Sequence, residues 1–270
     1  MDELVAPLLN HLDRVNPGDV VGVYLYGSAS TSGLRADSDI DLLMVTRRSL
    51  TASERTALVS LLLSVSGWRG HAERFPDAAH RRPIELTSFV MADVHPLTDT
   101  PRCDFQYGEW LREDLTDGRL PSPLDSPDAV VLLATAHSAC RVLRGPAFCD
   151  VVASVPSGQL RAAVLAVVPD ILEEIGGDER NVLLTLARIL VTLDTGRIVS
   201  KDAAAEAVTR TLTAPDRDLL ERARAGSLGT VTDDWTGLTS RVTELAHALA
   251  DRARRHSSPG LSAADQASGR

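Results

Sequence analysis

Apolar and polar positions at the start of the chain predict one helix followed by two strands. Leucines recur every three or four positions between residues 3 and 15, which is helical spacing, and an Asn-Pro-Gly sequence ends the pattern. Two apolar runs of strand length follow, at residues 20–26 and 39–45. Between them the apolar pattern breaks at Gly27-Ser28 and resumes with two aspartates, so this connection carries more than a turn signal.

The next segment predicts a second helix and a third strand. Residues 52–65 return to helical spacing, and Thr51 or Ser53 can cap the helix. Residues 81–90, RRPIELTSFV, alternate in a way that is typical of a strand. One face of that strand would carry Glu85, Thr87 and Phe89, and the other Ile84, Leu86 and Ser88. The first part of the chain is therefore predicted to combine a mixed β-sheet with helices.

From residue 128 onward the pattern is helical, and no strand is expected. We predict an α+β protein with a sheet-containing domain at residues 1–124, an all-α helical-bundle domain at 125–255 and a disordered tail at 256–270. Prolines at positions 121, 123 and 127 mark the expected linker. The predicted helical stretches are residues 129–143, 157–175, 178–196, 201–212 and 236–255.

Composition narrows the class of partner. The 270 residues are 44% apolar and 24% charged, which is enough to build a real core, and 28 basic against 37 acidic residues give a formal net charge of -9. A negative net charge repels nucleic-acid phosphate and favours a cationic substrate. The three cysteines form no C-x-x-C motif, and no apolar run approaches the roughly 18 residues of a membrane span. We expect a reduced, cytoplasmic protein, with neither a nucleic-acid nor a membrane partner.

The candidate chemistry lies in residues 20–45, VVGVYLYGSASTSGLRADSDIDLLMV. Asp39 and Asp41 are two residues apart on a strand and so share one face. Like charges about 4 Å apart repel by roughly 4 kcal/mol at an effective dielectric near 20, and a divalent cation removes that penalty. Mg²⁺ prefers one or two carboxylates together with substrate phosphates, and Gly27-Ser28 offers backbone N–H groups to a phosphate at a strand end. The alternative, a plain turn before a solvated edge strand, explains each feature alone but not their combination.

The same segment resembles a known signature. Residues 26–45, YGSASTSGLRADSDIDLLMV, are similar to the Gly-Ser and Asp-x-Asp motif of nucleotidyltransferases of the DNA polymerase β superfamily. Residues 105–115, FQYGEWLREDL, and 177–208, GDERNVLLTLARILVTLDTGRIVSKDAAAEAV, resemble stretches peculiar to bacterial aminoglycoside adenylyltransferases, which modify streptomycin at its 3″ hydroxyl and spectinomycin at its 9 hydroxyl. The resemblance extends from about Val20 to about Leu249.

In the first domain, the resemblance implies roles in metal binding, phosphate binding and catalysis for five residues. Asp39 and Asp41 would bind Mg²⁺, and Ser28 and Ser38 would lie near the triphosphate of ATP. Glu85 would be the catalytic base that takes the proton of the attacking drug hydroxyl. Its alternative is an exposed strand glutamate.

The resemblance also places Arg188 and Lys201 of the second domain beside the triphosphate. Against the drug it places Trp110 of the first domain and Asp178 of the second. Each also has an ordinary alternative: surface charge for the two cations, a core aromatic for Trp110 and a helix N-cap for Asp178. Because the proposed residues come from both domains, the expected active site is an interdomain cleft that ATP helps to close.

The activity that follows is ATP- and Mg²⁺-dependent transfer of AMP to a hydroxyl of an aminoglycoside or aminocyclitol antibiotic. Enzymes of the family that handle both drugs carry a tryptophan and an aspartate where this chain has Pro169 and Glu174, which favours spectinomycin and its 9-hydroxyl. Streptomycin 3″ transfer is the first alternative. A nucleic-acid or protein acceptor, or a catalytically idle interaction module, is a further alternative. A monomer that binds only ATP and the drug is expected.

Overall fold

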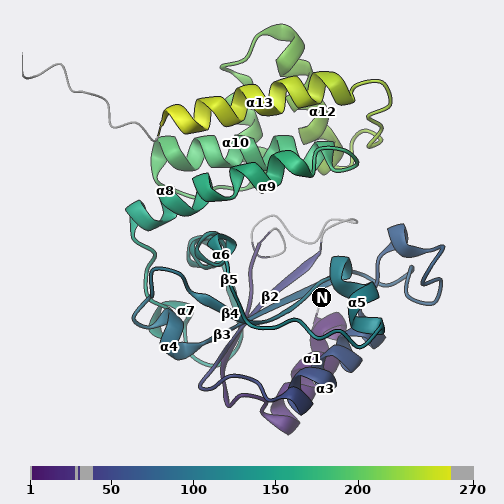
Figure 1. Ribbon diagram of the computed structural model, residues 1–270, viewed down its shortest axis with the longest axis vertical. Helices are drawn as coiled ribbons and strands as arrows, with labels where there is room; N and C mark the ends of the chain where they lie inside the picture. Colours follow the sequence, from purple (N-terminus) through teal and green to yellow (C-terminus); the bar gives the residue numbers. More distant parts are fainter. Residues whose placement is uncertain (1, 28–29, 31–38, 257–270) are drawn as a thin grey trace, which may run out of the picture. The chain divides into compact units, whose positions relative to one another are not determined.

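The computed structural model describes residues 2–27, 30 and 39–256, and the chain divides into two compact units, Met1–Ala163 and Val164–Arg270 (Figure 1). A mixed sheet with helices forms the first unit, and the described part of the second is helical. The predicted fold class is therefore confirmed. No helix in the described ranges is long and apolar enough to cross a membrane.

Six strands build the sheet of the first unit, in the order β5-β4-β3-β2-β1-β6. Only the central pair, β2 and β3, is parallel; the other neighbouring pairs are antiparallel. The strands are β1 (Val20–Leu25), β2 (Ile40–Thr46), β3 (Ile84–Val90), β4 (Arg102–Tyr107), β5 (Leu124–Asp125) and β6 (Arg141–Arg144). The three strands predicted from the sequence are thus present. The bounds of β1 and β2 agree with the predicted bounds to within one residue, and β3 begins at Ile84 instead of residue 81.

Helices α1 (Asp2–Val15) and α3 (Ala52–Val65) pack side by side on one face of the sheet (Figure 1). Thr51 caps α3 through a capping box: its hydroxyl accepts from Glu54 N at 3.3 Å, and the Glu54 carboxylate accepts from Thr51 N at 2.8 Å. A cap of this kind stabilises a helix by about 1 kcal/mol. The shared core on this face includes Leu8, Leu42, Leu58, Leu86 and Tyr107.

The opposite face of the sheet is covered by α4 (Met91–Val94), α6 (Pro127–Ser138) and α7 (Phe148–Val151). The Tyr24 and Phe148 rings meet there edge to face, with centroids 4.9 Å apart. Alternation along β2 and β3 assigns their side chains to the two cores, as expected for a sheet buried on both faces. The core of this second face includes Tyr24, Leu43, Phe89, Leu133 and Phe148.

Strand β6 corrects the prediction that no strand follows residue 128. Helix α6 ends at Ser138 instead of continuing to residue 143, and Arg141–Arg144 pairs antiparallel with β1. The Arg144 guanidinium also donates to both carboxylate oxygens of Asp13 on α1, at 3.0 and 2.9 Å. Because α6 and β6 belong to the sheet-containing unit, the predicted boundary at residue 124 lies inside that unit.

Helices make up the second unit in its described part. Helix α10 packs against α11, α12 and α13, and its buried face carries leucines at 183, 186, 190 and 193. Helix α12 is missed by the sequence reading because its segment, APDRDLLERARAGS, is mostly charged and small. The helices are α9 (Val168–Glu173), α10 (Glu179–Thr195), α11 (Lys201–Thr209), α12 (Ala214–Ser227) and α13 (Thr239–Arg255), and α8 (Ser157–Ala166) spans the division between the units. Apart from His256, the predicted tail lies outside the described residues.

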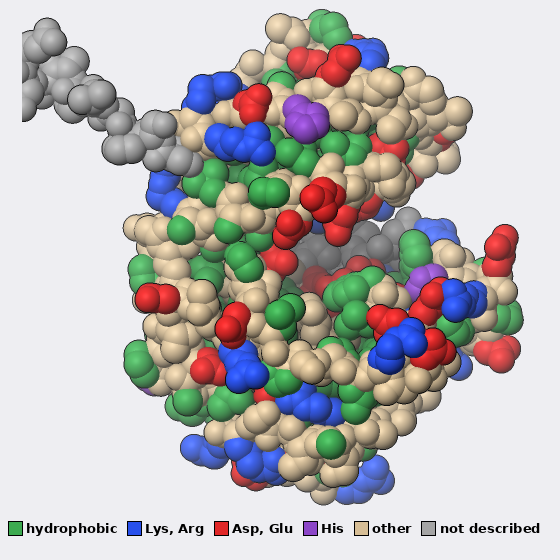
Figure 2. Space-filling model, in the orientation of Figure 1, with side chains coloured by type: hydrophobic (Ala, Val, Ile, Leu, Met, Phe, Trp, Pro, Cys, Tyr) green, Lys and Arg blue, Asp and Glu red, His purple; other side chains and the backbone are tan. Residues whose placement is uncertain are grey.

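Charged side chains of both signs lie on the face of the molecule shown in Figure 2. The basic side chains of the described residues form separate groups on this face and no continuous stripe.

Candidate active site

The parallel pairing of β2 and β3 brings two carboxylates together. Asp41 of β2 and Glu85 of β3 are direct register partners, so their side chains leave the sheet on the same face. Asp39 lies two residues before Asp41, immediately ahead of β2, and alternation places it on that face as well. All three residues are partly exposed to solvent. The predicted metal ligands and the predicted base thus occur on neighbouring strands, at the edge of the core that lies under α6.

A tight turn after β1 closes over the Asp41 carboxylate. Gly27 has φ of +69°, a conformation that favours glycine, and Tyr26 N donates to Asp41 O at 3.0 Å. A Cβ atom at Gly27 would overlap Asp41 Oδ2 and lie 3.0 Å from Asp41 Cγ. Ser30 fixes the turn, because its hydroxyl donates to Gly27 O at 2.9 Å and to Ala139 O at 3.1 Å. Glycine is therefore required here by both its φ and the close approach of the carboxylate.

Two predicted phosphate-binding residues, Ser28 and Ser38, lie outside the described residues. Their roles stay predictions from the resemblance. The described positions that flank them, Gly27 and Asp39, belong to the cluster around Asp41.

Trp110 lies on the same face of the sheet as Glu85. Strand β4 pairs Tyr107 with Leu86, and Gly108 continues in extended conformation, so a side chain at Gly108 would point to the face that Glu85 occupies. That space is filled by the Trp110 ring, which a Cβ atom at Gly108 would meet. Trp110 is 56% exposed, which rules out the alternative of a core aromatic. Its indole is therefore exposed on the Glu85 face, where it could contact a bound molecule.

The donor set suits a hard cation that shares its coordination with a substrate. In residues 2–27, 30 and 39–256, no group of three or more His, Cys, Asp or Glu side chains could hold a metal ion. Asp39 and Asp41 instead offer a pair of carboxylates on one face, and Mg²⁺ typically takes one or two carboxylates and completes its shell with phosphate and water. The residues therefore fit Mg²⁺ that arrives with a nucleotide.

In the second unit, a polar row follows one face of α10. Asp178, Asn181, Thr185 and Arg188 are spaced by three and four residues, so they lie on the same side of the helix. Asn181 Nδ2 donates to Asp178 Oδ2 at 2.9 Å, and Lys201 Nζ of α11 donates to Asn181 Oδ1. Asp178 occupies the N-cap position, but its side chain makes no capping bond to the backbone. The N-cap position predicted for Asp178 is therefore confirmed, while its carboxylate is bonded to the Asn181 side chain and not to the backbone.

Asn181 is a residue that the sequence reading missed. It joins Asp178, a predicted drug contact, to Lys201, a predicted triphosphate contact, through its two amide atoms. The available signal is its position three residues after Asp178 on a helix, which places the two side chains within reach of each other.

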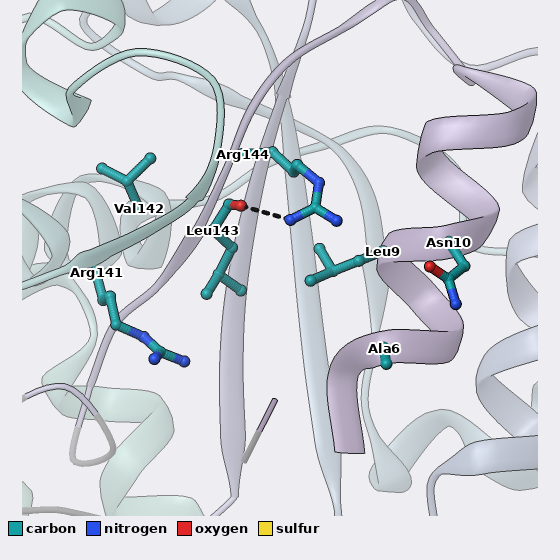
Figure 3. A pocket seen from close by; sticks show the side chains of 7 residues that line it. All are labelled: Ala6, Leu9, Asn10, Arg141, Val142, Leu143 and Arg144. Atoms are coloured by element: carbon teal, nitrogen blue, oxygen red, sulfur yellow. Dashed lines mark hydrogen bonds between the residues drawn. The ribbon is translucent and has the colours of Figure 1, made fainter. Parts of the chain in front are cut away.

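A groove between α1 and β6 is separate from these residues (Figure 3). Neither Asp41 nor Glu85 lines it, and its lining side chains include no carboxylate. In Figure 3 the Arg144 guanidinium donates to Leu143 O, at 2.8 Å. The lining residues are Ala6, Leu9, Asn10, Arg141, Val142, Leu143 and Arg144.

A mixed sheet with paired carboxylates, a glycine turn against one of them and a third carboxylate on the next strand defines the class of this protein as a nucleotidyltransferase. Residues 8–70 match the family model described as "Nucleotidyltransferase domain", and residues 150–252 match "Aminoglycoside adenylyltransferase, C-terminal domain". The chain belongs to the aminoglycoside adenylyltransferase family.

Curated relatives cover most of the chain. A spectinomycin 9-adenylyltransferase of Staphylococcus aureus is 40% identical over 226 residues, which are 84% of this chain and 85% of the relative. One from Campylobacter jejuni is 36% identical over 231 residues, 86% and 87% of the two chains. An aminoglycoside (3'') (9) adenylyltransferase of Escherichia coli is 32% identical over 249 residues, 92% and 91% of the two chains.

A solved structure extends this similarity to the fold. The spectinomycin adenyltransferase AAD(9) from Enterococcus, crystallised with ATP and spectinomycin, matches with a TM-score of 0.84 and 27% identity. The match covers 93% of this chain and 98% of that chain.

Proposed function

We propose that the protein transfers AMP from ATP to the 9-hydroxyl of spectinomycin and thereby confers resistance to the drug. The observation that carries the proposal is the direct register pairing of Asp41 with Glu85, which sets two carboxylates side by side on one face of the sheet. Such a pair can supply one metal ligand and one base. Relatives named as spectinomycin 9-adenylyltransferases support the choice of acceptor.

In this proposal Asp39 and Asp41 would hold Mg²⁺, and the backbone of the Gly27 turn would lie close to the phosphates. The ion supplies positive charge against the triphosphate. The two aspartates keep their carboxylates on one face so that phosphate oxygens can complete the coordination. Ser28 and Ser38 belong to the same phosphate-binding segment by their position in the sequence.

Glu85 acts as the general base. Its carboxylate accepts the proton of the spectinomycin 9-hydroxyl as that oxygen attacks the α-phosphorus of ATP, and pyrophosphate leaves with the bonding electron pair. Its place beside Asp41 supports this role, because proton acceptor and metal ligand must flank the same phosphorus.

Trp110 and Asp178 are proposed to bind the drug. The exposed indole of Trp110 stands on the Glu85 face and can pack against the apolar part of the fused rings. Asp178 offers a carboxylate to the cationic amines of the drug, and its bond to Asn181 orients it. Arg188 and Lys201 would stabilise charge on the triphosphate and on the pyrophosphate leaving group.

Residues before α10 support spectinomycin over streptomycin. Pro169 lies in the first turn of α9 and offers no aromatic face, and Glu174 is exposed at the end of that helix. Streptomycin is the longer drug and requires more contacts than the compact spectinomycin. Transfer to the 3″ hydroxyl of streptomycin is the second candidate, because a relative at 32% identity is named for both positions and Glu174 retains a negative charge.

Expression in a bacterium sensitive to both drugs tests the proposal. We expect strong protection against spectinomycin and little against streptomycin, with protection abolished by Asp41→Asn. Strong streptomycin resistance without spectinomycin resistance would overturn the acceptor, and protection that survives Asp41→Asn would overturn the mechanism.

A further inference from the structure

A buried ionic network lies beneath the turn that carries Trp110. Glu109 Oε1 accepts from Ser66 Oγ at 2.6 Å, from Arg112 Nη2 at 3.0 Å and from Tyr107 OH at 3.2 Å, and Glu109 Oε2 accepts from Arg112 Nε at 2.6 Å. None of these four residues is more than 7% exposed. We call Ser66, Tyr107, Glu109 and Arg112 the Glu109 network. Glu109 begins η2 (Glu109–Leu111), Arg112 begins α5 (Arg112–Thr116), Tyr107 ends β4, and Ser66 is the C-cap of α3.

Glu109 is ionised in this network. Burial alone would raise the pKa of Glu109, but hydrogen bonds from Arg112 and Ser66 outweigh it and leave that pKa below its usual value. Arg112 Nη2 also donates to Ser66 O at 2.7 Å and lies 3.5 Å from Leu63 O, so it caps the last carbonyls of α3. Glu109 and Arg112 are thus paired with each other and hydrogen-bonded to their surroundings. Loss of either charge would leave the other buried without its partner.

The network reaches the first amide of β3. The Pro83 carbonyl faces β2, since it accepts from Ile40 N at 2.9 Å, and the next amide along the strand, that of Ile84, therefore faces the β4 side. Ile84 N donates to Ser66 Oγ at 3.0 Å, and the same hydroxyl donates to Glu109. Ile84 is the residue immediately before Glu85.

Side chains here replace a backbone pair that the sheet lacks. The last β3–β4 pair on this side is Leu86 with Tyr107, and the same register continued by two residues would set Glu109 opposite Ile84. Instead, β4 ends at Tyr107 and the chain turns into η2. The Ser66 hydroxyl and the Glu109 carboxylate then bridge the gap. One network thereby anchors both the residue before Glu85 and the residue before Trp110.

We infer that Glu109 is a positioning residue, which fixes Glu85 through Ser66 and Trp110 through its own turn. The inference rests on the proposed function, in which Glu85 is the base and Trp110 binds the drug. Because Glu109 is buried and its carboxylate is held by Ser66, Tyr107 and Arg112, we expect it to act by holding these two side chains at a set separation.

Ser66→Ala tests the link, because it removes the bridge and leaves the Glu109–Arg112 pair in place. We expect kcat for spectinomycin to fall about 10- to 100-fold, as for a displaced catalytic group, with the KM for ATP changed by less than about 2-fold. The Ile84 amide, followed by NMR hydrogen exchange, should exchange at least about 10-fold faster. Ser64→Ala is the matched control, because the Ser64 hydroxyl on α3 donates to Leu61 O, outside the Glu109 network. This substitution should alter neither quantity.

A second pair of variants separates positioning from general loss of stability. Glu109→Gln should lower the Tm and reduce kcat at least as much as Ser66→Ala. Asp104→Asn is the control, because Asp104 is equally buried and ion-paired, with Arg55 at 2.9 Å, but secures the other end of α3. It should lower the Tm while kcat stays within about 3-fold of wild type.

An equal loss of kcat in Asp104→Asn and Glu109→Gln would overturn the inference, as would an Ile84 amide that exchanges at the wild-type rate in Ser66→Ala. A wild-type chain that adenylylates no antibiotic would instead overturn the proposed function. The amide exchange of Ile84 would still decide whether the network holds the start of β3.

Discussion

Substitution of Gly27 by alanine isolates the contribution of the turn that closes over Asp41. The backbone at Gly27 has φ of +69°, and an added Cβ atom would overlap Asp41 Oδ2 and lie 3.0 Å from Asp41 Cγ. Two separate costs follow. One is conformational strain at residue 27, and the other is displacement of the neighbouring carboxylate.

The first cost lowers the stability of the fold, and the second lowers the rate of catalysis. An L-residue in the left-handed region costs about 1–2 kcal/mol of stability. Carbon atoms make their best contact at about 3.5–4.0 Å, so the Asp41 carboxylate must move by on the order of 1 Å to accommodate the methyl group. The side chain can do so by rotation at little further cost in stability. A shift of about 1 Å in a catalytic group costs about 10²-fold in rate.

Gly118→Ala provides the matched control for strain. Gly118 lies in the same unit with φ of +82°, and an added Cβ there would meet no atom within 4 Å. We expect both variants to lose a similar increment of Tm in a thermal scan, whereas only Gly27→Ala loses about 10²-fold in kcat for pyrophosphate release with ATP, Mg²⁺ and spectinomycin. If Gly27→Ala keeps its wild-type kcat, or if Gly118→Ala loses as much, the contact with Asp41 does not govern catalysis.

Three further predictions concern individual side chains of the proposed site. Asp41→Asn should nearly abolish Mg²⁺-dependent pyrophosphate release while the Tm is retained, and substantial turnover would contradict its role as a metal ligand. Glu85→Gln should lower kcat by roughly 10²- to 10⁴-fold with calorimetric ATP affinity preserved; lost ATP affinity at an unchanged rate would make Glu85 a binding residue instead. Lys201→Met should reduce kcat/KM for ATP at least about 10-fold, whereas Arg210→Met, an exposed change at the end of the same helix, should not; equal effects would remove Lys201 from the triphosphate site.

Elements with local signals are predictable from the sequence, and those that depend on distant pairing are not. Helix α3 has the predicted bounds Ala52–Val65 because its capping box lies within four residues of sequence. Strand β6 could not be predicted from the sequence, because Arg141–Arg144 follows helix α6 without a Gly or Pro that would mark the end of the helix. The segment forms a strand because it pairs with the edge of β1, which lies far earlier in the chain. The charged helix α12 was not predicted for a related reason, since few apolar positions mark its buried face.

For the site, alternation along a single strand correctly placed Glu85 on the opposite face from Ile84, since Ile84 is buried and Glu85 is partly exposed. That Asp39 shares a face with Asp41 stays a prediction from the same alternation. The parallel register that sets Asp41 beside Glu85 is a tertiary property and carries no signal in either segment. Glu109 and Arg112 were missed because an oppositely charged pair three residues apart is usually a solvated surface pair. Only the fold reveals that both are buried under the Trp110 turn.

The most direct test of the account is to identify the product of the wild-type enzyme. Purified protein would be incubated with ATP, Mg²⁺ and either spectinomycin or streptomycin, with pyrophosphate followed in time and the modified hydroxyl assigned by NMR. The account predicts one pyrophosphate for each AMP attached to the 9-oxygen of spectinomycin, and no product when Asp41→Asn replaces the wild type. Transfer to the 3″ oxygen of streptomycin alone, or no nucleotide transfer to either drug, would contradict it.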